Sequence, residues 1–135
     1  MAKPALTIED ATRGIHFTAL EDNLLSDSWS DWSIREDGEK KFLRTKEGIE
    51  VKSGQEYSLN FRIKVKEVNI YFYDEDEGLM TNKTISKSMQ DFIYFTPPSD
   101  AKKVEIEFYR YSSENEYRAN LAKLKPFLGK YKVVF

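Results

Sequence analysis

Apolar and polar side chains alternate with a period of two residues through much of the second half of this chain. The alternation is clearest over residues 57–65, and it returns over 68–73 and 104–111. An extended backbone points successive side chains to opposite faces, so this period predicts strands with one buried face. Only Lys66 and Glu67 separate the first two runs, and so short a connection predicts an antiparallel hairpin.

Further strand candidates lie on both sides of these runs. Residues 91–96 are apolar on both faces and end at Pro97-Pro98, which cannot donate to a ladder. Residues 112–115 are typical of a turn, and 117–124 and 131–135 are expected to add two strands around Pro126 and Gly129. Upstream, short candidates at 15–17, 32–34, 41–44 and 49–51 are separated by turn residues, and residues 8–13 can form a short helix. We therefore predict an all-β fold, a two-sheet antiparallel β-sandwich (jelly roll) with a short N-terminal helix or arm.

Composition excludes several functions. The 135 residues carry 21 Lys and Arg against 23 Asp and Glu, so a net charge of −2 offers no basic field for nucleic acid or an anionic membrane. The absence of cysteine rules out disulfides and thiolate metal sites. Residues 1–10 lack a signal-peptide pattern, and no stretch has the length and apolarity of a transmembrane helix. We expect neither an export signal nor a membrane span.

Catalytic motifs are missing. His16 is the one imidazole, and no nucleophile elbow or glycine-rich phosphate loop occurs. A glycosidase needs only two carboxylates, so a glycosidase-like enzyme stays as the weakest alternative. Glu105 and Glu107 share a predicted strand face beside tyrosines, where we expect them to be solvated, with nothing to raise a pKa. We therefore predict a protein that is not an enzyme and needs no cofactor.

The order of several segments resembles a known family. These segments are 23–25, Trp29 with Trp32, 51–61, 69–74, 95–101, 104–109 and 120–124. In that order they are similar to carbohydrate-binding-module-like (galactose-binding-like) jelly-roll domains of bacteriophage tail, baseplate and fibre proteins and of some bacterial glycosidases. The resemblance implies a sandwich that often binds saccharide and in some members holds a structural calcium. It covers roughly residues 23–125, leaving 1–22 as an N-terminal arm or extra strand and 126–135 as a C-terminal strand or extension.

Strand parity places a candidate ligand face. If Val68, Ile70 and Phe72 point to the core together with alternate residues of 104–108, the opposite face carries tyrosines. Sugars combine apolar C–H faces with hydroxyls, so aromatic rings beside amide, carboxylate and guanidinium groups can bind them. The same tyrosines could instead pack against another subunit, since strand surfaces favour Tyr in any case. The candidate saccharide contacts are Tyr71, Tyr73, Tyr109, Tyr111, Asn69 and Glu107, with Asn60 and Arg62 as further polar groups if their strands are neighbours.

Two other features have a ligand-binding and a structural interpretation. Trp29 is the better candidate for stacking on a sugar, because Trp32 precedes a strand and one such ring is often buried with its N–H bonded to backbone. The run Asp74-Glu75-Asp76-Glu77-Gly78 could supply Asp74 and Asp76 to calcium, but it fails the EF-hand spacing. A solvated hairpin loop is the simpler interpretation of this run.

Three functional hypotheses follow. The first is a noncatalytic phage or prophage virion module, associated with the tail, baseplate or fibre, that binds host-surface saccharide or decorates the particle. The second is a structural subunit whose tyrosine face binds other virion proteins or copies of itself. The third is the glycosidase-like enzyme. The resemblance also implies a homo-oligomer, by analogy a trimer, located in the virion.

Overall fold

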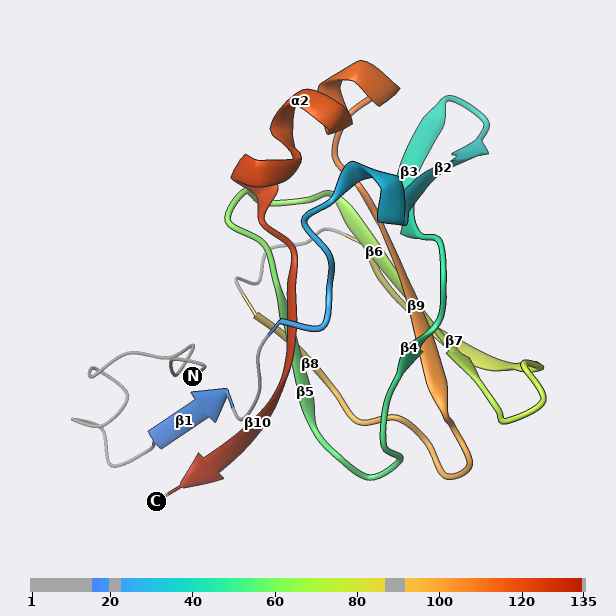
Figure 1. Ribbon diagram of the computed structural model, residues 1–135, viewed down its shortest axis with the longest axis vertical. Helices are drawn as coiled ribbons and strands as arrows, with labels where there is room; N and C mark the ends of the chain where they lie inside the picture. Colours follow the sequence, from blue (N-terminus) through green and yellow to red (C-terminus); the bar gives the residue numbers. More distant parts are fainter. Residues whose placement is uncertain (1–15, 20–22, 87–91, 135) are drawn as a thin grey trace.

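The computed structural model of the protein describes residues 16–19, 23–86 and 92–134. Within them the chain forms two antiparallel β-sheets and one α-helix, which lies at one end of the sheets (Figure 1). The predicted two-sheet antiparallel β-sandwich is therefore confirmed. The helix predicted at residues 8–13 lies outside the described residues.

The two sheets draw their strands from distant parts of the sequence. The four-stranded sheet has the order β1-β10-β5-β8, with β1 at His16–Ala19, β10 at Phe127–Val134, β5 at Tyr57–Asn60 and β8 at Phe92–Phe95. The six-stranded sheet has the order β2-β3-β9-β6-β7, and β4 also pairs with β9. Its strands are β2 (Trp32–Asp37), β3 (Lys40–Thr45), β4 (Ile49–Glu50), β6 (Glu67–Tyr73), β7 (Leu79–Ser86) and β9 (Lys103–Tyr109).

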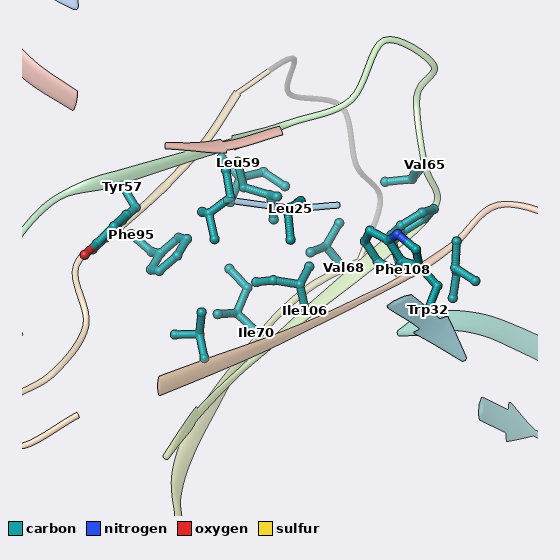
Figure 2. Close-up of a cluster of buried hydrophobic side chains, with 14 of the residues drawn as sticks. Leu25, Trp32, Tyr57, Leu59, Val65, Val68, Ile70, Phe95, Ile106 and Phe108 are labelled. Atoms are coloured by element: carbon teal, nitrogen blue, oxygen red, sulfur yellow. The ribbon is translucent and has the colours of Figure 1, made fainter. Parts of the chain in front are cut away.

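The core lies between the sheets and contains the residues of β6 and β9 that were predicted to face inward. Val68, Ile70 and Phe72 of β6 are buried, as are alternate residues of β9, and they meet Leu59 and Leu128 of the other sheet within one cluster. Figure 2 shows part of this cluster, with Phe108 beside Trp32 and Tyr57 beside Phe95. The period-two pattern therefore identified the inward faces of β6 and β9 correctly.

The predicted hairpin between residues 57–65 and 68–73 is wrong. Strand β5 ends at Asn60, and the chain then crosses to the other sheet, where β6 begins at Glu67. The crossing segment finds backbone partners outside a ladder: the Arg62 N–H donates to the Leu124 carbonyl (2.8 Å) and the Lys66 N–H to the Tyr109 carbonyl (2.7 Å). Its apolar residues still pack on the core, so the alternation continued although the strand had ended.

The strand predicted at 117–124 is also wrong, because these residues belong to helix α2 (Glu114–Leu124). Ser113 caps the helix, accepting the Glu116 N–H at 3.2 Å while its hydroxyl bonds the Glu116 carboxylate at 3.1 Å. This Ser-x-x-Glu capping box marks a helix start, and the expected turn at 112–115 concealed it. Tyr117, Leu121 and Leu124 lie at helical spacing and are buried on one face.

Strand β7 was not predicted at all. Residues 79–84 are exposed and polar residues occur on both faces, so β7 has no alternation of apolar and polar positions. The turn before it is the acidic run, whose interpretation as a hairpin loop is confirmed: Asp74 and Gly78 are joined by a 3.0 Å backbone hydrogen bond. Strand β10 begins at Phe127, four residues earlier than expected, and the upstream candidates fall within or overlap β1, β2, β3 and β4.

Tyr117 ties α2 to the six-stranded sheet. Its hydroxyl donates to the Lys41 carbonyl (2.5 Å) and accepts the Arg110 N–H (2.9 Å), and its ring is fully buried. Tyr117→Phe keeps the ring but removes the hydroxyl from the Lys41 carbonyl and the Arg110 N–H, so we expect the free energy of unfolding to fall by about 1–3 kcal/mol. Urea denaturation measures this. Tyr111→Phe is the control on a half-buried ring and should cost less; an equal loss would contradict the account.

Candidate functional site

The tyrosine face predicted from parity is the outer face of the six-stranded sheet, the side turned away from the core. Tyr71 and Tyr73 of β6 and Tyr109 of β9 are half-buried there. The register places Arg44 of β3 opposite Glu107 of β9, and Glu107 opposite Asn69 of β6. Charged, amide and phenol groups from three adjacent strands therefore meet on one surface.

Glu107 is at the centre of this surface, and its side chain is fully buried. Arg35 of β2 donates two hydrogen bonds to its carboxylate, from Nε at 2.7 Å and from Nη2 at 2.6 Å. Arg44 Nη1 donates at 3.1 Å, Asn69 Nδ2 at 2.7 Å and the Tyr71 hydroxyl at 3.1 Å. A bidentate guanidinium and three further donors saturate the carboxylate, which is the condition for burying its charge.

A second layer of contacts fixes the tyrosine rings. The Arg44 guanidinium also bonds Glu105 and donates to the Tyr73 hydroxyl at 3.0 Å, and its carbon lies 4.5 Å from the centre of the Tyr71 ring. These cation–π and hydrogen-bond contacts hold both rings in place. The Tyr109 ring packs against Phe42, with the Lys40 and Lys66 ammonium groups 5.7 Å and 5.3 Å from its centre.

The pKa values reflect this arrangement. Burial acts to raise the pKa of Glu107, but the hydrogen bonds from Arg35 and Asn69 and the charge of Arg35 outweigh it, so the pKa is lowered below 4.5. Burial and the neighbouring carboxylates raise the pKa values of Tyr71 and Tyr73 above 10.0. At neutral pH the Glu107 carboxylate is therefore ionised, while the Tyr71 and Tyr73 phenols are neutral.

The expectation that Glu105 and Glu107 are both solvated is wrong for Glu107. Arg35 and Arg44 were not predicted as site residues, although they supply most of the charge-assisted bonds. Their strands were expected only as short, unpaired fragments, so nothing indicated that β3 lies beside β9. The available signal was local: Arg35 and Arg44 flank the tight turn at Asp37-Gly38 and would face one side of a hairpin.

Several predicted site residues lie elsewhere. Asn60 belongs to β5 of the four-stranded sheet and Arg62 to the crossing segment beside the end of α2, so neither can complete the tyrosine face. Tyr111 follows the end of β9 and packs edge-on against Tyr117. Trp29 is half-buried against the core, with Arg118 6.0 Å from its ring centre. Trp32 is buried and its Nε1–H donates to the Ser26 carbonyl at 2.9 Å. This agrees with the structural interpretation, in which one of the two tryptophans is buried with its N–H bonded to the backbone.

A cleft of about 470 Å³ opens where the outer face ends at Tyr73 and Glu105. The segment between β3 and β4 forms its other wall, and Gly48 lets this segment approach β9, since a Cβ there would lie 3.0 Å from the Lys103 side chain. Here we name it the Tyr73 cleft. It is lined by Lys46, Glu47, Gly48, Tyr73, Glu77, Lys103 and Glu105.

Two further clefts lie away from the tyrosines. One of about 400 Å³ lies across residues 46–48 from the Tyr73 cleft and includes Trp32 and Asp31 in its wall. Another, of about 460 Å³, lies between Arg62, the end of α2 and Pro126. Arg62 therefore belongs to a different surface from the tyrosines.

The acidic loop uses its first carboxylate internally. Asp74 Oδ1 accepts the backbone N–H of Asp76 at 3.0 Å and of Gly78 at 2.9 Å. Within the described residues, no group of three or more acidic or histidine side chains is arranged to hold a metal ion. Asp74 thus has a structural role in closing the turn between β6 and β7.

Comparison with known proteins gives distant structural likenesses. No protein-family model and no curated protein matches the sequence. Among solved structures, the glycosylation-associated protein (Gap123) complex from Streptococcus agalactiae aligns with 88% of this chain at 15% identity and a TM-score of 0.37, and this chain spans 44% of that one. Accessory secretory protein 1, 2 and 3 from Streptococcus pneumoniae aligns with 84% of this chain and 93% of its own at 12% identity and a TM-score of 0.39.

A third likeness is to TmCBM61 in complex with beta-1,4-galactotriose, with 5% identity, 98% of both chains covered and a TM-score of 0.36. None of these three is described as a phage protein. Similarities at these scores carry no argument about function. In the described part of the chain, no helix has the length and apolarity needed to cross a membrane.

Removing the charge of Glu107 tests the centre of the site. Glu107→Gln leaves Arg35 and Arg44 without their shared carboxylate and sets an amide N–H against their donors. We expect the free energy of unfolding to fall by about 2–3 kcal/mol. Glu105→Gln is the matched control: the Glu105 side chain is 22% exposed, so its loss should cost about 1 kcal/mol or less. Urea denaturation of both variants measures the difference, and a ranking in the opposite order would refute the central role of Glu107.

The lowered pKa of Glu107 also predicts a pH dependence. A carboxyl whose pKa is lower in the folded than in the unfolded state stabilises the fold fully above its ordinary pKa of 4.5, and that stabilisation disappears as the pH falls through the folded value. We therefore expect the free energy of unfolding to decline more steeply below about pH 4.5 in the wild type than in Glu107→Gln. Parallel curves for the two proteins would show that Glu107 does not contribute.

Proposed function

We propose that this protein is a noncatalytic binding module that recognises a saccharide in the Tyr73 cleft and on the adjoining tyrosine face. The observation that carries the proposal is that Tyr73, whose side chain is held in place, lines a polar cleft. Tyr73 has its hydroxyl fixed by Arg44 and lines a cleft that also contains two ammonium and three carboxylate groups. Such a wall offers hydrogen-bond donors and acceptors around a ring.

The chemistry of the cleft matches a sugar better than a simple ion. Carboxylates and ammonium groups are interspersed, with Lys103 paired to Glu77 at 3.1 Å, so no field of a single sign builds up. A neutral, hydroxyl-rich ligand can accept from the lysines and donate to the carboxylates without a net charge being buried. The fixed tyrosines would then contact its apolar C–H face, with little side-chain freedom left to lose on binding.

The same geometry argues against glycoside hydrolysis at this site. That reaction needs a carboxylic acid whose pKa is raised enough to protonate the leaving group, and a second carboxylate open to the substrate. Glu107 has a lowered pKa, is fully buried and has its oxygens occupied by donors. These properties make Glu107 unsuitable for either catalytic role and support a structural role for it at the centre of the face.

The biological setting that we propose comes from the sequence resemblance alone. The segments similar to phage tail, baseplate and fibre domains would place the module in a virion, where the saccharide is on the host surface. Immunodetection of the protein on purified particles would test that setting. It is independent of the cleft, because a saccharide site can serve a protein in any location.

A glycan array followed by calorimetric titration tests the binding proposal. Tyr73→Ala removes the ring from the cleft wall, and we expect the affinity for a retained saccharide to fall by at least about tenfold, equivalent to ~1.4 kcal/mol. Arg62→Ala, in the separate cleft beside α2, is the control and should bind as the wild type does. Loss of binding in both variants, or no saccharide retained by the wild type, would contradict the proposal.

A second candidate is a structural subunit that binds a protein through the same face. The favouring observation is that the hydrogen-bonding groups at the centre of the face are already satisfied from within, and Arg44 covers the Tyr71 ring. Tyrosine and arginine of this kind are enriched at protein interfaces. Failure to bind any glycan, together with co-purification of a partner that Tyr109→Ala releases, would favour this function.

A further inference from the structure

The exposed edge of β7 differs from the other described edges. It ends the six-stranded sheet and is eight residues long, whereas β2 at the other end has six residues and β1 and β8 have four each. Strand β2 carries the charged residues Arg35, Glu36 and Asp37, but Lys83 is the one charged residue of β7. Long edges with few charges are the ones that accept another strand.

The usual protection by an edge lysine is weakened in β7. The Lys83 ammonium donates to the Tyr94 carbonyl of β8 at 3.3 Å, so its charge is drawn toward the other sheet. Strand β7 also carries two exposed large apolar side chains, Leu79 and Met80. Exposed apolar side chains beside an unpaired strand mark a surface suited to an interaction.

We propose that β7 pairs with β7 of a second copy of this chain, forming an antiparallel dimer with one continuous sheet. Two-fold symmetry is the common route to such pairing, because one surface then serves both partners. A net charge of −2 per chain opposes it only weakly. The proposal goes beyond saccharide binding and does not depend on it.

Side-chain parity and charge select the register. Residues opposite each other in an antiparallel pair share a face, so a symmetric pairing must place a residue opposite its own copy. Centring on Asn82 pairs residues 79–85 of the two copies and sets Lys83 opposite Thr81. Centring on Lys83 gives equal overlap but opposes two like charges, which is unfavourable. The dimer axis therefore passes beside Asn82.

This arrangement brings the outer faces of two copies side by side. Asn82 and Thr84 lie opposite Tyr71 and Asn69 in the β6–β7 register, on the side of the sheet that carries the tyrosines. The axis would thus run between two tyrosine faces that point the same way. A ligand with repeated units could then contact both faces of a dimer, with a gain from multivalency.

Charge exchange at Asn82 tests the dimer. Sedimentation equilibrium over about a hundredfold range of concentration should show wild-type dimers. Asn82→Lys and Asn82→Asp each place like charges across the axis, and we expect each to raise the dissociation constant at least about fivefold. An equimolar mixture of the two variants should associate again, because opposite charges then face each other.

The matched controls are Ser53→Lys and Ser53→Asp, which make the same charge changes in the exposed turn before β5 and should leave the dimer intact. Circular dichroism confirms that the Asn82 variants remain folded. A wild type that is monomeric throughout, including one whose β7 pairs with a different protein, overturns the proposal. So does an oligomer that ignores the Asn82 charges, or a mixture that fails to restore association.

Discussion

The outer face of the six-stranded sheet depends on one buried charge, the Glu107 carboxylate. It joins strands that are far apart in the sequence, because its hydrogen-bond donors come from β2, β3 and β6. Removing a carboxylate from water is costly unless charged donors replace the lost hydration. Two arginines do so here, and one of them, Arg44, also holds the phenols of Tyr71 and Tyr73. The geometry of the candidate site is thus a consequence of neutralising Glu107.

A face organised in this way is rigid before any ligand arrives. Arg44 holds the Tyr71 and Tyr73 side chains and the hydroxyls of both are hydrogen-bonded, so binding would order few side chains. The Tyr73 cleft is less rigid than this face, because it lies where the hydrogen-bond network ends and exposed charged side chains begin. We therefore propose that the cleft determines specificity and that the tyrosine face is a fixed support. The β7 edge lies beside that support and offers a separate route to assembly.

The sequence predicted the inward and outward faces of β6 and β9 because a period of two residues follows directly from extended backbone geometry. It misplaced residues 61–66 because a segment crossing between sheets can keep the same alternation while it leaves the ladder. It misassigned residues 117–124 as a strand. These residues form a helix because Ser113 and Glu116 cap its start and because Tyr117, Leu121 and Leu124 reach the core at helical spacing. Strand β7 was missed because it has no buried face to show a pattern.

The sequence by itself determined that the chain is built mainly of strands and that tyrosines of β6 and β9 point away from the core, since both results need only local periodicity. Only the tertiary structure decided which charges those tyrosines would meet. Arg35 and Arg44 reach Glu107 because β2 and β3 pair in order beside β9, and strand order depends on contacts between distant residues. The same strand order excluded Arg62 from the site and left β7 at the edge. Burial of Glu107 by partners more than 60 positions away could not be deduced from its neighbours in sequence.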